Sequence, residues 1–259
     1  MMKIGYDGFN SYVAKNFYNR YKSKYKIYKF KSDINNINKL STFINKKKIS
    51  VFIRVGALSR SKCDSYPKKC LSINYNANKR LVDFLMKKKI KLIFLSSSHV
   101  YSHSIKKINE KSKINPTNRY AKYKLKSENY IKKHLNNYLI IRIFNIYGKQ
   151  QPKGYFISDI KEKIKNKQSI SINNSYRDFI HVDEVSRFLA FSIFKDLKGI
   201  FNLGSGKSYH LADIIKIISI KMKIKFNLLI NKKKDKLISD NTLIEKSGFK
   251  VKNEKNFSF

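Results

Sequence analysis

Short apolar runs alternate with helical patterns along the first 148 residues of the chain. The pattern predicts strands at 2–6, 24–30, 49–57, 90–98 and 138–148, and helices at 11–20, 33–48, 72–89 and 120–135. In the second helical segment, apolar residues recur at helical spacing at Ile34, Ile37, Leu40, Phe43 and Ile44. Such alternation predicts βαβ units and a parallel sheet covered on both faces.

The pattern becomes less regular after Gly148, although no low-complexity linker divides the chain there. Strand-like runs return at "DFIHV" (178–182) and "GIFNLGSG" (199–206). We therefore expect a larger domain at 1–148 and a small lobe at 149–259, with some segments of the lobe returning to the core of the larger domain.

Two glycines, Gly5 and Gly8, are expected in a loop between the first strand and the first helix. Glycines at such a place let the backbone approach a pyrophosphate at a helix N-terminus. Ser11 stands where a third glycine is usual, and its small side chain still permits close packing of helix and strand. The loop favours an α/β fold with a Rossmann-type, doubly wound parallel sheet, although two turn glycines without a ligand would give the same pattern.

A net charge of +40 raises the alternative of nucleic-acid binding. The excess is nearly all Lys and is spread along the whole chain, whereas Arg, which reads bases and phosphates best, is scarce. The abundance of Lys, Ile and Asn together is typical of an AT-rich coding sequence. We therefore expect solvated surface lysines and no nucleic-acid partner.

The apolar content, 42% of residues, is typical of a globular protein, and no apolar run reaches the roughly 20 residues that span a bilayer. We expect no membrane partner, and no signal peptide before "MMKIGYDG". Cys63 and Cys70 are too few for a disulfide framework or a metal site. A reducing, cytoplasmic setting is expected, and a homodimer stays open.

Tyr120 and Lys124 form a Tyr-x-x-x-Lys pair, which means little by itself. Random placement of 17 Tyr and 49 Lys in 259 positions gives about three such pairs. The chain has four, and the others begin at Tyr18, Tyr25 and Tyr75. Only the surrounding motifs distinguish the fourth pair.

Seven segments in order resemble the extended short-chain dehydrogenase/reductase family, the NAD(P)-dependent epimerases, dehydratases and reductases of nucleotide sugars. They are "SDINNINKL", "VFIRVGA", "SINYNANKRLVDFL", "FLSSSHVYS", "NPTNRYAKYKLKSE", "IIRIFNIYG" and the late pair "YRDFIHVDEV" with "FNLGSG". The second segment departs from the family at Arg54 and Gly56. The resemblance marks Tyr120 and Lys124 as the active-site pair and makes the other three pairs coincidental.

The resemblance implies a catalytic triad of Ser97, Tyr120 and Lys124. Tyr120 and Lys124 share a helix face, and a nearby ammonium group lowers a phenol's pKa from its usual value of about 10. Tyr120 would then act as general acid/base, while Lys124 also holds the nicotinamide ribose. The alignment on "VY" puts Ser97 at the family's Ser/Thr position, with Ser96 and Ser98 as alternatives.

His99 stands near this triad, two positions before Tyr101. Family dehydratases carry an Asp-Glu pair where this chain has Ser98 and His99. Imidazole titrates near neutral pH, so His99 is a candidate acid or base. A histidine that only lines the cleft is the equal alternative.

The remaining binding residues also follow from the resemblance. Asp33 and Ile34 match the adenine-contacting segment, and with Gly5, Gly8, Ser11 and Lys124 they form the expected cofactor site. Asn145 and Arg177 match the residues that contact the substrate's diphosphate, with a structural ion pair between Arg177 and Asp178 as the alternative. The cofactor is NAD or NADP, and Lys29 and Lys31 after the second strand lean towards NADP.

The expected function is hydride transfer at a 4-keto or 4-hydroxyl position of a nucleotide sugar, by a reductase or an epimerase. The chain is short for the family, and the missing residues fall in the substrate-binding lobe. The alternative is a non-catalytic NAD(P)-binding sensor or regulatory protein on the same fold.

Overall fold

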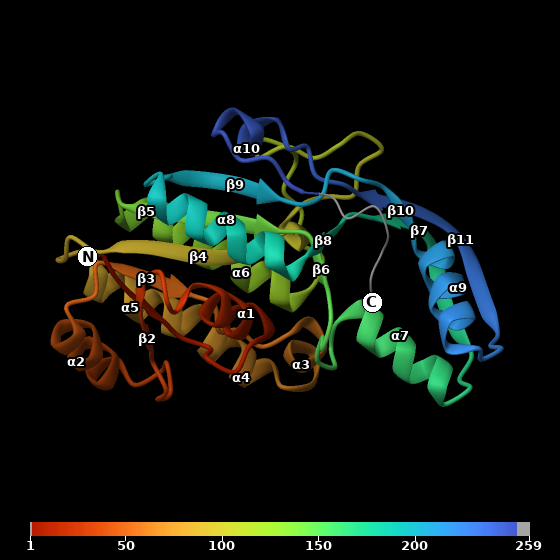
Figure 1. The fold of residues 1–259 in the computed structure, drawn as a ribbon, viewed down its shortest axis with the longest axis horizontal. Helices are drawn as coiled ribbons and strands as arrows, with labels where there is room; N and C mark the ends of the chain where they lie inside the picture. The colour runs from red at the N-terminus through yellow and green to blue at the C-terminus, as the bar shows by residue number, and fades with distance from the viewer. Residues whose placement is uncertain (1, 253–259) are drawn as a thin grey trace.

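The computed structural model describes residues 2–252 and contains a six-stranded parallel sheet (Figure 1). Its strand order is β2-β1-β3-β4-β5-β9. The strands are β1 (Lys3–Tyr6), β2 (Lys26–Lys29), β3 (Val51–Arg54), β4 (Lys91–Ser97), β5 (Tyr138–Ile143) and β9 (Gly199–Leu203). Every neighbouring pair is parallel, and β3 and β4 are buried along their full length. The predicted α/β class with a doubly wound parallel sheet is confirmed.

Helices cover both faces of this sheet (Figure 1). On one face, α1 (Tyr12–Tyr21) and α8 (Val182–Phe194) enclose a core that includes Phe17 and Phe188. On the other face, α2 (Ile37–Lys47), α5 (Ala77–Leu85) and α6 (Arg119–His134) pack on the sheet through residues such as Leu81 and Ile131. Both faces are apolar because a parallel sheet is buried on both sides.

A second, smaller sheet of β10-β7-β11 lies beyond the carboxyl ends of the main strands (Figure 1). It combines β7 (Ile170–Arg177), β10 (Tyr209–His210) and β11 (Leu228–Leu237), and helices α7 (Phe156–Lys165) and α9 (Leu211–Met222) pack on it around Ile164 and Ile215. A two-stranded pair, β6 (Asn145–Tyr147) with β8 (Phe179–His181), stands between the two sheets. Although α8 and β9 follow Gly148 in the chain, they belong to the main layer.

The remaining elements are short. They are α3 (Arg60–Ser65), α4 (Pro67–Leu71), a π-helical turn η1 (Ser72–Asn76), a 3₁₀ turn η2 (Ser98–Val100) and α10 (Thr242–Lys246). The helix predicted at 72–89 therefore begins with a π turn and becomes α-helical only at Ala77. No helix within residues 2–252 has the length and apolarity that crossing a membrane requires.

Gly5 differs from its predicted place, because it lies inside β1 and not in the following loop. A Cβ atom at this position would stand 3.1 Å from Cγ2 of Ile49 and 3.2 Å from Cδ2 of Phe52. Gly5 thus permits close packing between β1 and its neighbours. Gly8 is the single glycine in the turn that leads into α1. Its φ of +62° lies in the left-handed region that favours glycine.

Candidate active site

The residues of the expected triad meet where β4 ends and α6 begins. Ser97 is the last residue of β4, and Tyr120 and Lys124 lie on the first turns of α6. The Asn118 side chain fixes the start of that helix by accepting a hydrogen bond from the Ala121 amide at 2.9 Å. Ligands of open α/β sheets bind at the carboxyl ends of the strands, and this site is at that edge.

Lys124 is the buried cation of the site and is only 3% exposed. Its Nζ donates to the Leu95 carbonyl oxygen at 2.6 Å and lies 4.7 Å from the centre of the Phe94 ring. The pKa of Lys124 is lowered to about 7, chiefly by burial and also by the Arg54 cation, while Asp7 and Glu128 oppose both effects. Lys124 therefore changes charge near neutral pH.

Tyr120 is the phenol next to this cation, with its ring centre 5.8 Å from Nζ of Lys124. The pKa of Tyr120 is raised to about 12, chiefly by burial and also by Tyr155. A hydrogen bond with Ser97 opposes this rise. The expectation that Lys124 brings this pKa below 10 is wrong for this structure, because burial dominates and Lys124 itself is only partly charged near pH 7. Tyr120 keeps its proton and is able to donate it.

The hydrogen bond to Tyr120 favours Ser97 over the two alternative serines. Ser96 instead donates to the buried carboxylate of Glu128. Ser98 is buried at the start of η2, and the serine that forms a hydrogen bond with Tyr120 is Ser97. The structure therefore places Ser97 beside the phenol, and its catalytic role stays a prediction.

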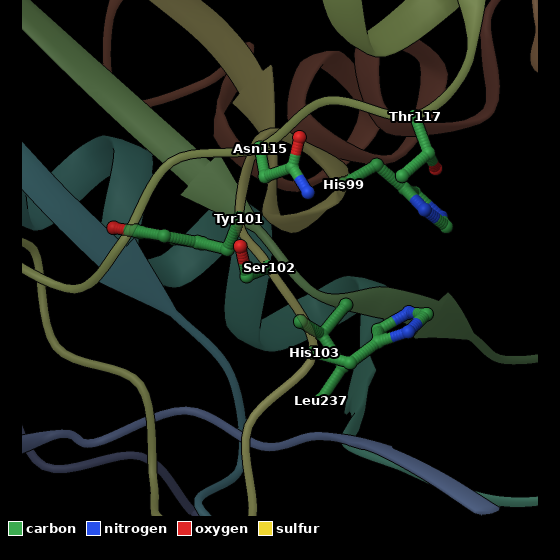
Figure 2. A pocket seen from close by; sticks show the side chains of 7 residues that line it. All are labelled: His99, Tyr101, Ser102, His103, Asn115, Thr117 and Leu237. Atoms are coloured by element: carbon green, nitrogen blue, oxygen red, sulfur yellow. The ribbon is translucent and has the colours of Figure 1, made fainter.

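His99, whose backbone amide donates to Oγ of Ser97 at 3.3 Å, lines a polar cavity of about 230 Å³ (Figure 2). The cavity is lined by His99, Tyr101, Ser102, His103, Asn115, Thr117 and Leu237. The pKa of His99 is lowered to about 4, chiefly by burial. Arg60, Arg177 and His103 act in the same direction. His99 is therefore neutral at pH 7, where it can exchange hydrogen bonds but does not serve as an imidazolium acid.

We expect His99 to make the protein less stable as the pH falls from about 6.5 to about 4. Its folded pKa of about 4 lies below the ordinary 6.5, so the unfolded chain takes up a proton first. Stability is complete above the unfolded value and declines as the pH falls towards the folded value. The free energy of unfolding in urea at about pH 7 and about pH 4.5 measures this loss.

The His99→Gln variant should lose less stability than the parent between those two pH values. His134→Gln is the matched control, because His134 packs on Tyr130 in the last turn of α6, far along the helix from the cavity. The control should keep the parent's pH dependence. Equal losses in parent and His99→Gln would show that His99 does not carry the effect.

The expected cofactor residues lie at the carboxyl ends of β1 and β2, apart from Gly5. Ser11 caps α1 by accepting from the Ala14 amide at 3.3 Å, and no acidic residue stands in the first turn of that helix. Asp33 is exposed, and its carboxylate accepts from the backbone and side chain of Asn35. Ile34 is buried in the core between the sheet and α2.

This arrangement fits a dinucleotide. The partial positive charge at the α1 N-terminus suits a pyrophosphate, since no carboxylate in the first turn of that helix opposes an anion. Gly8 and Gly56 approach so closely that a Cβ atom on Gly8 would stand 2.6 Å from Cα of Gly56. Lys124 donates one hydrogen bond to the Leu95 carbonyl oxygen, and a charged ammonium group has three donors, so it is able to donate to hydroxyl groups as well.

The two expected substrate-binding residues lie between the sheets. Asn145 donates from Nδ2 to the Asp178 carbonyl oxygen at 2.9 Å. Arg177 pairs with Asp235, so the alternative of an Arg177–Asp178 pair is wrong. The Asp178 carboxylate points elsewhere and accepts from the amides of Ser205, Gly206 and Ser239.

The positive charge of Arg177 nevertheless acts on the polar cavity, because it lowers the pKa of two histidines that line it, His99 and His103. Arg142 on β5 forms a buried ion pair with Glu128 at 2.6 Å. Sequence reasoning missed Tyr155, which acts on Tyr120 from the start of α7. Nothing local in the sequence marks Tyr155, since its place depends on how the second sheet packs against the first.

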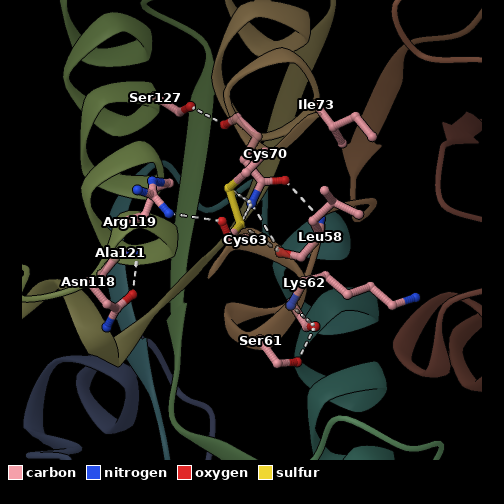
Figure 3. The surroundings of a disulfide bond; sticks show 12 residues. Leu58, Ser61, Lys62, Cys63, Cys70, Ile73, Asn118, Arg119, Ala121 and Ser127 are labelled. Atoms are coloured by element: carbon pink, nitrogen blue, oxygen red, sulfur yellow. Dashed lines mark hydrogen bonds between the residues drawn. A yellow bond between two sulfur atoms is a disulfide. The ribbon is translucent and has the colours of Figure 1, made fainter. Parts of the chain in front are cut away.

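Cys63 and Cys70 form a disulfide between α3 and α4, although the sequence predicted no disulfide framework (Figure 3). Both cysteines are fully buried. The Asn74 side chain contacts both sulfur atoms and also binds the backbone of Leu58. Arg119, the residue before Tyr120, donates to the Cys63 carbonyl oxygen at 3.2 Å, so the bond fixes a segment next to the triad.

We expect reduction of this disulfide to cost about 2–3 kcal/mol of stability, because the bond closes a short loop of sequence separation 7. For a chain of this size, that corresponds to a fall in Tm of about 4–10 °C. Thermal unfolding with and without a dithiol reductant measures it. A Cys63→Ser/Cys70→Ser double variant is the control, since its Tm should not respond to the reductant.

Mass spectrometry after thiol alkylation of the denatured, unreduced protein provides the direct check. The disulfide predicts no alkylated cysteine. Two alkylated cysteines, or a Tm that ignores the reductant in the parent, would contradict it.

The sequence and the fold of this chain are similar to those of known proteins. Residues 8–204 match the NAD dependent epimerase/dehydratase family. The chain is 30% identical over 211 residues to an ADP-L-glycero-D-manno-heptose-6-epimerase of Brachyspira hyodysenteriae. That match covers 75% of this chain and 66% of the relative, so the chain spans just under two thirds of the relative's length.

Solved structures show the same fold at low identity. A dTDP-4-dehydrorhamnose reductase from Bacillus anthracis in complex with NADP gives a TM-score of 0.84 at 19% identity, covering 97% of this chain and 94% of that one. A Thermus thermophilus UDP-glucose 4-epimerase in complex with NAD gives 0.83 at 13% identity, with coverages of 97% and 94%. At such identities the likeness concerns the fold.

Proposed function

Because the chain belongs to the NAD dependent epimerase/dehydratase family, we propose that it is an NAD(P)-dependent reductase or epimerase of a nucleotide sugar, with hydride transfer at a 4-keto or 4-hydroxyl position. The observation that carries the proposal is the meeting of Ser97, Tyr120 and Lys124 beside a polar cavity. These residue types together polarise a carbonyl and deliver a proton to it.

The nicotinamide supplies or accepts the hydride when it is bound. Tyr120 donates its phenolic proton to the sugar oxygen during reduction, which its raised pKa permits at neutral pH. Ser97 holds the same oxygen through its hydroxyl group. Lys124 binds the nicotinamide ribose and, in its charged form, stabilises the phenolate that remains after proton transfer.

The choice between NAD and NADP depends on the residues after β2. Lys29 is engaged, because its Nζ lies 3.5 Å above the centre of the Tyr18 ring. Lys31 is exposed two positions before Asp33. It is therefore the residue that favours NADP over NAD. The structural neighbours include complexes with NAD and a complex with NADP.

A ligand screen tests the proposal. Thermal unfolding of the purified protein is measured with NAD, NADP and their reduced forms, and then with each dinucleotide plus dTDP-4-dehydrorhamnose, UDP-glucose or an ADP-heptose. We expect Tm to rise with one dinucleotide class and to rise again with one nucleotide sugar. Turnover is then measured for that pair by the change in nicotinamide absorbance.

Two outcomes decide between the candidate functions. Binding of a dinucleotide without turnover of any of these sugars would favour the non-catalytic sensor. No response to any dinucleotide would end the assignment of a cofactor site. Light scattering on the same samples decides whether the protein is a homodimer.

A further inference from the structure

A buried chain of polar side chains connects the loop before α1 with the helix that carries Tyr120 and Lys124. Asp7, which follows β1, pairs with Arg54 at the end of β3. Nε of Arg54 donates to Oδ1 of Asn78 on α5 at 2.6 Å. Nδ2 of Asn78 then donates to Oγ of Ser127 at 2.9 Å, and Ser127 lies one turn after Lys124 on α6.

Arg54 is the centre of this chain and is only 1% exposed, although it stands in an otherwise apolar strand. Besides Asp7 and Asn78, its guanidinium donates to the carbonyl oxygens of Gly56 and Ile73. A planar group with several fixed donors suits such a junction, and a buried cation without these partners would be costly.

Asp7 anchors the loop from the other side. Its Oδ1 accepts from the amides of Val55 at 2.8 Å and Gly56 at 3.1 Å, while Oδ2 accepts from Arg54. The Asp7 carboxylate therefore links the loop that contains Gly8 to the end of β3 by hydrogen bonds. At this place the backbones of Gly8 and Gly56 are in close contact. The pair joins two elements that a dinucleotide would contact.

The charged groups that act on Lys124 come from several elements. Asp7 and Arg54 act on it from the ends of β1 and β3, Glu128 acts from α6 and forms an ion pair with Arg142 on β5, and Tyr120 lies on the same helix as Lys124. β4 contributes the Leu95 carbonyl oxygen and the Phe94 ring. Within residues 2–252, no carboxylate forms an ion pair with Lys124.

We propose that Asp7 and Arg54 are positioning residues for Lys124: through Asn78 and Ser127 they hold the cofactor loop and the end of β3 against the part of α6 that carries Lys124. The directions of the electrostatic effects support this, since Arg54 lowers and Asp7 raises the pKa of Lys124. The consequence for catalysis rests on the proposed function, whereas the control of the Lys124 charge does not.

The experiment is a titration of Lys124 in the unliganded protein. NMR of ¹³Cε-labelled lysine follows its protonation, and the Lys124→Met variant identifies the resonance. Surface lysines titrate near 10.4, so a lysine that titrates near neutral pH stands apart from them. Asp7→Asn should raise the proton dissociation constant of Lys124 about tenfold, and Arg54→Gln should lower it by a similar factor.

Two further variants separate charge from geometry. The Asp7→Asn/Arg54→Gln double variant should titrate near the parent, because the two charges are removed together. Arg54→Lys keeps the charge but loses the guanidinium fork, so its Lys124 should also titrate near the parent while thermal stability falls. If Arg54→Gln fails to fold, Asp7→Asn and Arg54→Lys still give different expectations, because only Asp7→Asn should shift the titration of Lys124.

Lys91 is a control within the same spectra. It is a second buried lysine with a lowered pKa, but it pairs with Asp196 at the opposite end of β4. Its titration should be unchanged in all variants. Shifts of Lys124 in the same direction in Asp7→Asn and Arg54→Gln, or no shift in either, would overturn the proposal.

The functional consequence has its own readout. Calorimetry measures dinucleotide binding at a series of pH values. As the pH rises, Asp7→Asn should lose affinity at a lower pH than the parent, because its Lys124 gives up its proton at a lower pH. If no dinucleotide binds at all, the proposed function fails while the titration of Lys124 in the unliganded protein still decides the inference.

Discussion

Replacing Tyr120 by Phe is expected to lower turnover by about 10²–10⁴-fold, the range that a general acid or base contributes. The change removes the hydroxyl group that Ser97 contacts and keeps the ring, so the fold should survive. Because the parent phenol has its pKa raised to about 12, it supplies a proton over the whole neutral range. Steady-state kinetics with the sugar and dinucleotide found by the ligand screen measure the loss.

The sequence provides matched controls for this substitution. Tyr75 has the same spacing to a lysine, but its ring stacks on Tyr123 at an interplanar angle of 16° and lies outside the triad. Tyr75→Phe should therefore keep full turnover, as should the same change at Tyr18 and Tyr25. A Tyr120→Phe variant that behaves like these three would limit the family resemblance to the fold.

The other members of the triad should fail in different ways. Lys124→Met should weaken dinucleotide binding as well as turnover, because Lys124 is assigned to the ribose and to the phenolate. Ser97→Ala should lower turnover with little change in dinucleotide affinity, since its partner is the sugar oxygen. Equal effects on affinity in both variants would contradict this division of roles.

Replacing Gly8 by Ala is expected to weaken dinucleotide binding by at least about 100-fold, which corresponds to about 2.7 kcal/mol. The new Cβ atom would stand 2.6 Å from both N and Cα of Gly56, so backbone must move. That movement displaces the turn before α1 and the Gly56 amide that Asp7 holds. Calorimetry with NAD and NADP measures the affinity, and circular dichroism confirms that the protein is folded.

Gly199→Ala is the matched control for Gly8→Ala. Gly199 has a φ of +96°, but nothing lies within 4 Å of a Cβ atom built on it. This variant carries the strain of a positive φ without a clash, far from the loop, at the start of β9. It should lose stability and keep its dinucleotide affinity. Unchanged affinity in Gly8→Ala would show that the loop is only a turn.

The main sheet and the proximity of Tyr120 to Lys124 could be predicted because their signals are local. Alternating apolar strands and helical patterns specify βαβ units whatever the rest of the chain does. Tyr120 and Lys124 share a helix face through the geometry of one helix, and Asn118 sets where that helix begins. The order of the family's motifs then separated this pair from three coincidental ones.

The length of β1 was less well determined by sequence. "KIGY" is compatible with a strand that ends before or after Gly5, and only the pairing of β1 with β2 and β3 places Gly5 inside it. The contacts of Gly5 with Ile49 and Phe52 arise from that pairing. A short strand has no internal signal that fixes its last residue.

Only the tertiary structure decided which charged and sulfur-containing side chains are partners. Arg177 pairs with Asp235 across the parallel strands β7 and β11, and not with its neighbour Asp178. Asp7 and Arg54 are 47 positions apart and meet because β1 and β3 are adjacent. The pKa of Tyr120 depends on its burial and on the electrostatic effect of Tyr155, which is distant in the sequence. Composition and spacing do not contain these distances, because each one is set by how separate elements pack and by the water that their packing excludes.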